Sequence, residues 1–384
     1  MYRRKLIFWS ACAGMLLFGT SIIALGSIAP DLTGKLNLDE ISSGTLFSIM
    51  PIGILAGSML FGPIADRFGY KFLLAFSCMM LFVGFEGLAF APSVSIIKIF
   101  VFLAGFSGGA INGATNALMA DISENNKGAN LSLLGVFFGI GALGMPLALG
   151  LLKEIFRFET IVASVGLLSL ITGIFYLVIK FPPPKQSHGY HVSNILIILK
   201  DRFILLIAFF LFFQSSFEGI INNWTTTYLI DHTGLGQRSA LFGLSVFVAG
   251  MASMRLITGT LLRSARENKI LYAAFWFILS GLVILDFGQG IILSYCGLFI
   301  LGAGLASGFP VMLGFTGNLY AELSGTAFSI VLAIALLGNM SVNYLMGIIA
   351  KNFGIQHLTT VAMIELIMLA LLAAFILKKI KSTV

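Results

Sequence analysis

Charged residues are scarce in this sequence of 384 residues: only 10% are Asp, Glu, Lys or Arg, while 58% are hydrophobic. An average soluble domain carries about 25% charged residues. So little charge could not cover the core of a soluble protein, which excludes the ordinary soluble classes. The net charge of +7 does not indicate nucleic-acid binding either, because the Lys and Arg residues flank apolar segments and form no single basic face.

Cysteine is also rare, and its placement predicts neither a disulfide framework nor a metal site. Cys12, Cys78 and Cys296 all lie in apolar runs without the spacing of metal ligands. The sequence shows no nucleophile–base arrangement and no phosphate-binding glycine loop. We therefore expect that the protein is not an enzyme and holds no metal and no cofactor, apart from a coupling ion considered below.

Long apolar runs take the place of these features. A helix needs roughly 20 apolar residues to cross the hydrocarbon core of a bilayer. The first run follows a basic cluster, but its length exceeds the ~7–15 residues of a signal-peptide core, so we interpret it as a retained helix. The sequence predicts twelve spans, at about 6–29, 41–63, 72–91, 95–121, 128–151, 158–180, 203–230, 240–262, 269–288, 291–318, 325–350 and 356–380.

The distribution of positive charge predicts the orientation of these spans. Loops on the cytoplasmic side of a membrane carry an excess of Lys and Arg. Most of the 23 Lys and Arg residues fall on one side if both termini lie on that side. We therefore expect cytoplasmic termini, and the short loops without a glycosylation acceptor favour a bacterial inner membrane.

The chain divides into two similar halves. Residues 181–202 hold three consecutive prolines and read as a cytoplasmic linker between a six-helix bundle at 1–180 and a second one at 203–384. A shift of 197 residues places Gly53 on Gly250 and Gly105 on Gly302. Two pseudo-symmetric bundles predict an alternating-access transporter whose substrate site lies between the halves.

The stretch Gly62–Lys71, GPIADRFGYK, stands between the second and third spans. It resembles the cytoplasmic loop motif of the major facilitator superfamily, G-x-x-x-D-R-x-G-x-K, at every specified position. The resemblance implies that fold, all-α with twelve transmembrane helices, and a transport function. It also implies gating roles for the motif residues Gly62, Asp66, Arg67, Gly69 and Lys71.

A narrower resemblance points to the fucose–galactose–glucose symporter family. The fifth span matches its F-x-x-x-G-A-x-x-x-P pattern at Phe137, Gly141, Ala142 and Pro146, and Glu218 stands six residues before Trp224, as is frequent there. Two acidic positions of the fucose permease pattern are occupied instead by Gly26 and Asn112. Proton or sodium coupling has therefore moved to another acid or is absent.

Glu218 is an ionisable residue within one of the longest apolar runs. Gln214, Glu218 and Asn222 are spaced i, i+4, i+8 and share one helix face, with Asn223 and Trp224 beside them. The resemblance implies that the seventh span lines the cavity. Two interpretations stay open for Glu218: it contacts substrate or a coupling cation, or it is a protonated acid that bonds spans 7 and 11.

Two further amide pairs, Asn112 with Asn116 and Asn339 with Asn343, have i, i+4 spacing. Unpaired amides are costly in hydrocarbon, so each pair must turn to a solute, to water or to another helix. Both substrate binding and helix bonding stay open for them, and the second pair favours helix bonding.

Other charged residues are expected to have local roles. We expect Glu86 and Glu365 to snorkel or to pair locally. We expect Arg255 to reach toward the cytoplasm, with an ion pair at a gate as its alternative. Asp121 is expected to be a partner at a helix end or in the latch formed by the gating motif.

These observations predict a secondary transporter for a small neutral polar solute, with a monosaccharide as the leading candidate, driven by protons or sodium through Glu218. Efflux of amphipathic or drug-like compounds and passive facilitation are alternatives, and a membrane receptor or scaffold is the alternative outside transport. The expected partners are the solute and the lipid bilayer, not nucleic acid, and the expected state is a monomer.

Overall fold

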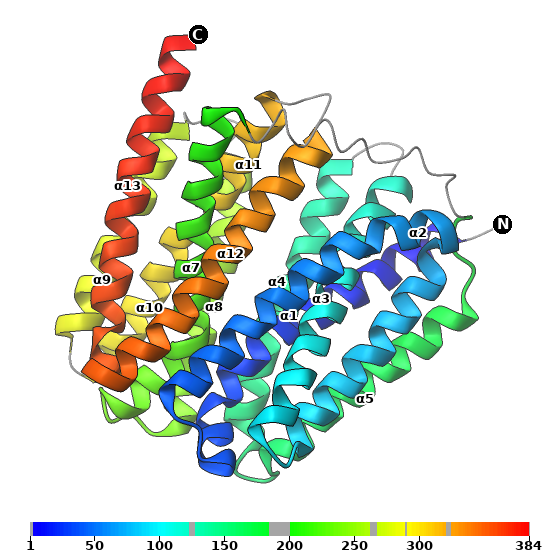
Figure 1. The fold of residues 1–384 in the computed structure, drawn as a ribbon, viewed down its shortest axis with the longest axis horizontal. Helices are drawn as coiled ribbons and strands as arrows, with labels where there is room; N and C mark the ends of the chain where they lie inside the picture. The colour runs from blue at the N-terminus through cyan, green and yellow to red at the C-terminus, as the bar shows by residue number, and fades with distance from the viewer. Residues whose placement is uncertain are drawn as a thin grey trace. The chain divides into compact units, whose positions relative to one another are not determined.

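A computed structural model describes residues 3–122, 127–183, 200–261, 267–288, 290–319 and 324–383. All the described elements are helices (Figure 1). They are α1 (Arg4–Leu36), α2 (Glu40–Phe90), α3 (Val94–Ile122), α4 (Lys127–Leu152), α5 (Phe158–Val178), α7 (Arg202–Asp231), α8 (Gln237–Leu261), α9 (Glu267–Phe287), α10 (Ile291–Leu305), α11 (Gly308–Leu319), α12 (Ser324–Phe353), the 3-10 helix η2 (Ile355–His357) and α13 (Leu358–Thr383).

Twelve helical segments are long and apolar enough to span a membrane. Helix α2 supplies two of them, Glu40–Phe61 and Phe68–Phe90, and α10 and α11 together supply one, Ile291–Thr316. The predicted all-α fold with twelve spans is confirmed. Large apolar side chains such as Trp276 and Phe287 are 68% and 79% exposed, as lipid-facing residues are.

The turn between the second and third spans depends on one glycine. Gly69 interrupts α2 with φ 80° and ψ 164°, a conformation that residues with a Cβ rarely adopt. The next residue, Tyr70, donates its hydroxyl hydrogen to Asp121 of α3 at 2.7 Å. Asp121 was expected to be a partner at a helix end or in the latch, and it bonds a residue of the gating motif. The gating role of Gly69 stays a prediction.

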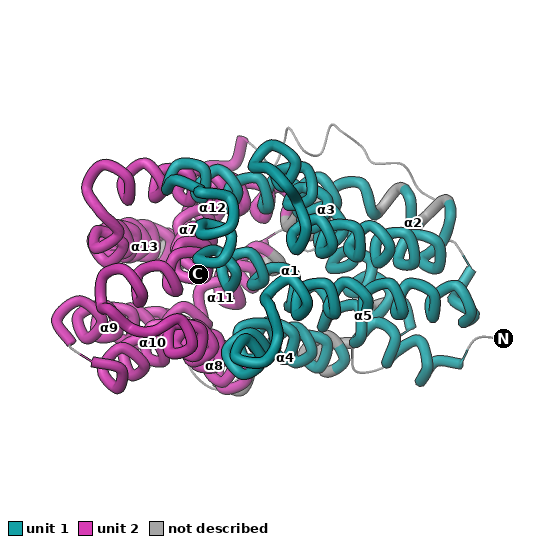
Figure 2. The backbone as a smooth tube through the Cα atoms, turned by 90° about the horizontal axis from the view of Figure 1, so that it is seen from below, with its two compact units in different colours: residues 1–189 teal, residues 190–384 magenta. Residues whose placement is uncertain are grey.

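The chain forms two compact units, residues 1–189 and 190–384, coloured separately in Figure 2. In the first unit α2 packs on α3 and α5, and α1 packs on α3 and α4. In the second unit α7 packs on α8, α12 and α13, and α10 packs on α8 and α9. Residues 184–199, most of the predicted linker, lie outside the described residues.

The two units repeat the same close helix contacts. A Cβ added to Gly53 would overlap the carbonyl oxygen of Phe102, and one added to Gly250 would overlap that of Phe299. The same holds for Gly105 on Met50 and for Gly302 on Phe247. Both members of each contact are related by the shift of 197 residues, so the glycine repeat in the sequence marks equivalent sites of backbone contact.

These contacts make a stability prediction. Gly53→Ala and Gly250→Ala should each lower the free energy of unfolding by about 1–3 kcal/mol, because the new methyl group overpacks a backbone contact. The measurement is thermal unfolding of each purified variant in detergent.

Gly144→Ala is the matched control, since no described atom lies within 4 Å of a Cβ at this exposed position of α4. It should not be destabilised. Equal stability of all three variants would contradict the repeated close contacts.

Candidate functional site

Helix α7 presents polar groups on three sides within the second unit. Successive residues of a helix are about 100° apart, so neighbours in sequence face different helices. Gln214 and Glu218 contact α8 and α10, Ser215 and Asn223 contact α12, and Ser216 contacts α13. The candidate site is built around the first of these sides.

Gln214 connects α7 to the end of α10. Its side chain is 2% exposed, and its Nε2 donates to the carbonyl oxygen of Leu305 at 2.8 Å and to Oε1 of Glu218 at 3.0 Å. Leu305 is the last residue of α10. The amide therefore satisfies a carbonyl oxygen that has no partner further along its own helix.

The carbonyl oxygen of Leu305 is available to Gln214 because span 10 is broken, a feature that was not predicted from the sequence. The tenth span was predicted as one run from 291 to 318, but α10 ends at Leu305 and α11 begins at Gly308. Pro310 lies in the first turn of α11, where it removes one backbone donor toward the end of α10. Discontinuous membrane helices are frequent at transporter binding sites, so the Gly- and Pro-rich stretch 304–310 was the available signal.

The break also lets Gln214 approach. A Cβ at Gly308 would overlap the side-chain amide of Gln214, so a larger residue here would displace that amide. Beside it, Ser307 Oγ lies 3.0 Å from Oγ1 of Thr258 on α8. The interruption of span 10 is thus enclosed by α7 and α8.

Glu218 forms an ion pair with α8. Arg255 Nη2 lies 3.3 Å from Oε2 of Glu218, and the two side chains are 34% and 15% exposed. The ion pair that was the alternative for Arg255 is present, and its place at a gate stays a prediction. The alternative in which Glu218 bonds span 11 is wrong, since its partners among the described residues are Gln214 and Arg255.

One helical turn beyond Glu218, Asn222 has unused hydrogen-bonding capacity. Its Oδ1 is buried and has no hydrogen-bond partner among the described residues. Trp224 is 1% exposed, so its indole would have to move before it could cover a bound solute. Of the two, Asn222 is therefore the one whose present geometry suits a ligand.

The predicted residues of span 11 contact another side of α7. Asn343 is fully buried and accepts from Asn223 Nδ2 at 3.0 Å, while its own Nδ2 donates to Asn339 Oδ1 at 3.0 Å. Asn339 Nδ2 donates to the carbonyl oxygen of Ser215 at 2.9 Å. The three amides form a ladder between α7 and α12, the geometry expected from the helix-bonding interpretation.

In the first unit, Asn112 and Asn116 lie on one face of α3. Asn116 Nδ2 donates to the carbonyl oxygen and to Oδ1 of Asn112, both at 2.9 Å, and both side chains are half-buried. The pair is brought together as its spacing predicts. Its role in substrate binding stays a prediction.

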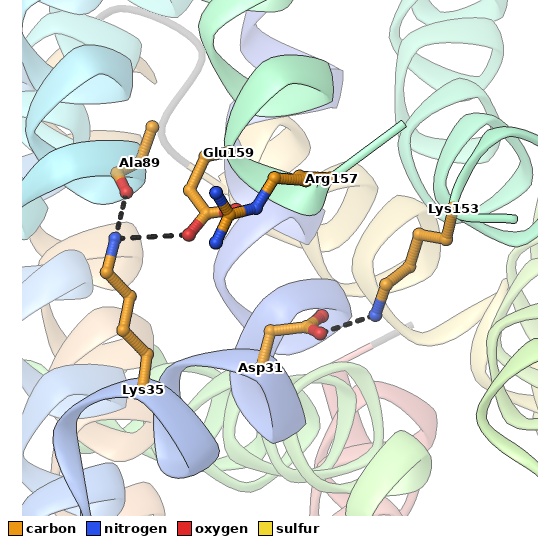
Figure 3. Close-up of polar contacts among 6 residues, drawn as sticks. All are labelled: Asp31, Lys35, Ala89, Lys153, Arg157 and Glu159. Atoms are coloured by element: carbon orange, nitrogen blue, oxygen red, sulfur yellow. Dashed lines mark hydrogen bonds and ion pairs between the residues drawn. The ribbon is translucent and has the colours of Figure 1, made fainter. Parts of the chain in front are cut away.

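A charged network in the first unit was not predicted. Lys153 contacts Asp31 at 2.5 Å, and Lys35 contacts both the carbonyl oxygen of Ala89 at 2.6 Å and Glu159 at 3.4 Å (Figure 3). These contacts tie the end of α1 to α2, α5 and the turn after α4. We interpret the network as a clamp on the helix ends.

The remaining predictions concern the gating motif and the two acidic residues Glu86 and Glu365. The side-chain surroundings of Gly62, Asp66 and Arg67 lie outside the described part of the chain, so their gating roles stay predictions. Lys71 Nζ lies 5.9 Å from the centroid of the Phe72 ring. Glu365 is 3% exposed and bonded to Ser216, the local pairing that was one of its two expected roles. Glu86 lies close to Gly166 of α5, and its expected role stays a prediction.

Comparison with known proteins identifies the family. The Major Facilitator Superfamily profile matches residues 11–340. The chain belongs to this superfamily. Members it resembles include the uncharacterized MFS-type transporter YfkL of Bacillus subtilis, 23% identical over 88% of this chain and 87% of that protein. The multidrug resistance protein MdtG of Escherichia fergusonii is 27% identical over 82% and 79%. The protein is a transporter and not an enzyme.

Solved structures share the fold at low sequence identity. The nucleoside transporter NupG has a TM-score of 0.78 and 15% identity, over 99% of this chain and 100% of that one. A D-xylose–proton symporter has a TM-score of 0.80 and 16% identity, over 96% of each chain. At such identities the likeness establishes the fold alone.

The amide ladder gives a prediction that separates helix bonding from substrate binding. Asn343→Leu should lower the free energy of unfolding by about 1–3 kcal/mol, because Asn223 and Asn339 each lose a buried partner. Thermal unfolding of the purified variant in detergent measures this loss.

Asn352→Leu is the control on the same helix, since Asn352 is exposed and bonds only within its own helix at Ile348. Wild-type stability of Asn343→Leu, combined with weakened solute binding, would contradict the ladder and favour a role in the binding site.

Proposed function

We propose that this protein is a secondary active transporter of a small neutral polar solute, a monosaccharide or a polyol of similar size. Transport proceeds by alternating access and is coupled to protons or sodium through Glu218. The protein acts as a monomer in a bacterial inner membrane, with both termini in the cytoplasm.

The observation that carries this proposal is the polar face formed by Gln214, Glu218 and Asn222 beside the break in span 10. The Glu218–Arg255 pair has no net charge, so it favours a neutral solute over an anion or a cation. The carboxylate and the free Asn222 Oδ1 accept hydrogen bonds, and Arg255 donates them. Adjacent hydroxyl groups of a sugar supply both kinds of partner.

Coupling follows because a proton or sodium ion competes with Arg255 for the carboxylate of Glu218. A proton or sodium ion bound to the carboxylate weakens its attraction for Arg255, because the carboxylate charge is then neutralised. The guanidinium is thereby released to the solute or to another acceptor. Solute binding and ion binding then favour each other, as coupled transport requires.

Efflux of an amphipathic compound is the second candidate, and the similarity to MdtG over most of the chain favours it. The D-xylose transporter of Levilactobacillus brevis matches only 33% of this chain, at 27% identity. The hydrogen-bonding groups around Glu218 favour a hydroxylated solute over an apolar one.

A ligand panel distinguishes the two candidates. Purified protein is heated with monosaccharides, polyols and lipophilic cations, each with and without sodium and across pH, because a ligand that binds the folded state raises its unfolding temperature. Stabilisation by sugars or polyols supports the proposal. Stabilisation by lipophilic cations alone would contradict it.

The coupling role makes a sharper prediction. In proteoliposomes with an imposed ion gradient, Glu218→Gln should abolish accumulation of the solute that the panel identifies, because the amide takes up no proton and lacks the negative charge that attracts sodium. Exchange of labelled for unlabelled solute should persist. Glu267→Gln, at an exposed position where α9 begins, is the control and should accumulate solute normally. Normal accumulation by Glu218→Gln would remove the coupling role.

A further inference from the structure

A second carboxyl group lies deep in the second unit, on another side of α7. Glu365 of α13 is 3% exposed, and its Oε1 forms a short hydrogen bond with Oγ of Ser216 on α7. Ser216 and Glu218 are two residues apart, about 200° around the helix, so Glu365 and the Glu218 site lie on opposite sides of α7.

Within the part of the chain that the structure describes, no cation forms an ion pair with Glu365. Its Oε2 is buried without a hydrogen-bond partner in the described chain. The charged residues on the helices packed against α13 are engaged elsewhere or lie near helix ends. Glu218 pairs with Arg255, and Asp286 at the end of α9 accepts from Thr359. Arg202 and Asp231 lie at the two ends of α7, Glu267 and Lys269 lie where α9 begins, and the ring of His357 in η2 contacts Phe353. Lys351 lies in the last turn of α12, and Lys378 and Lys379 are more than three turns along α13.

The two oxygen neighbours of Ser216 suit a proton on this carboxyl group. Ser216 Oγ lies 3.0 Å from the carbonyl oxygen of Phe213 and within hydrogen-bonding distance of Glu365 Oε1, and both of these oxygens can be acceptors. A serine hydroxyl carries a single hydrogen. If that hydrogen goes to Phe213, the second bond exists only when Glu365 is protonated and donates to Ser216.

We propose that Glu365 is a resident proton-binding site, a neutral carboxylic acid that fastens α13 to α7. The bonded chain runs from Glu365 O–H to Ser216 Oγ and from Ser216 O–H to the Phe213 carbonyl oxygen, where it ends. A backbone carbonyl cannot pass a proton on, so this proton stays in place during transport. A bare carboxylate without a cation partner would be costly at this depth.

Infrared difference spectroscopy at neutral pH tests the protonation state. Wild type minus Glu365→Gln should show the carbonyl stretching band of a protonated carboxylic acid. In Ser216→Ala the band should persist at a shifted position, because the acceptor of its O–H is gone. The exposed control Glu267→Gln should leave the band unchanged. If the acid band is unchanged in Glu365→Gln, or if Ser216→Ala leaves its position unchanged, the proposal is overturned.

Transport tests whether the proton stays in place. Glutamine retains an N–H donor toward Ser216. Proteoliposomes with Glu365→Gln should therefore accumulate the solute that the ligand panel identifies to within twofold of wild type. Loss of accumulation with exchange retained would show that the proton moves, and would overturn the resident assignment. If the glutamine variant does not fold, Ser216→Ala, which keeps the acid, replaces it in the infrared measurement. Its acid band should then appear at a shifted position, and a missing or unshifted band would overturn the proposal.

Discussion

A carboxylate within a membrane-spanning helix requires compensation, and the ion pair between Glu218 and Arg255 supplies it. Taking one charge out of water is expensive, whereas a hydrogen-bonded pair recovers much of that cost. Gln214 adds to this compensation, because its amide donates both to the carboxylate of Glu218 and to the carbonyl oxygen of Leu305 at the break in span 10. The broken helix, the amide and the two charges therefore depend on one another.

Helix α7 can hold this arrangement because its other sides are fixed independently. The amide ladder with α12 sets one contact, and the bond between Ser216 and Glu365 sets another toward α13. Gly338 of α12 packs directly against the backbone of Phe212 on α7, which brings these two helices close enough for the ladder. A polar face on a rigid central helix is a suitable place for a solute that must be held and then released.

Much of the fold could be predicted from the sequence, because bilayer thickness fixes the length of apolar runs. The motif that contains Gly69 also marks the loop between the second and third spans. The break at Leu305 was missed because the apolar run was judged by its length, although Gly304, Gly308 and Pro310 mark the place of the break. The partner of Glu218 was missed for a different reason. Residue spacing identifies groups on one face of a helix, but it does not show which neighbouring helix brings Arg255 to that face.

The network around Asp31 and Lys153 was missed because its members come from helix ends far apart in sequence. The amide ladder was predicted in part, since Asn339 and Asn343 were recognised as a pair. Its link to Asn223 required the packing of α7 on α12. In each case the identity of the residue was visible in the sequence and its partner depended on tertiary structure.

The central claim is that Glu218 is kept in the membrane by its interaction with Arg255. A double-mutant cycle of Glu218→Gln and Arg255→Gln, read as the free energy of unfolding in detergent, measures this most directly. The account predicts that the double variant is more stable than the sum of the two single losses implies, by at least about 1 kcal/mol, because each single change leaves one charge unpaired. Losses that add within about 0.5 kcal/mol would contradict it.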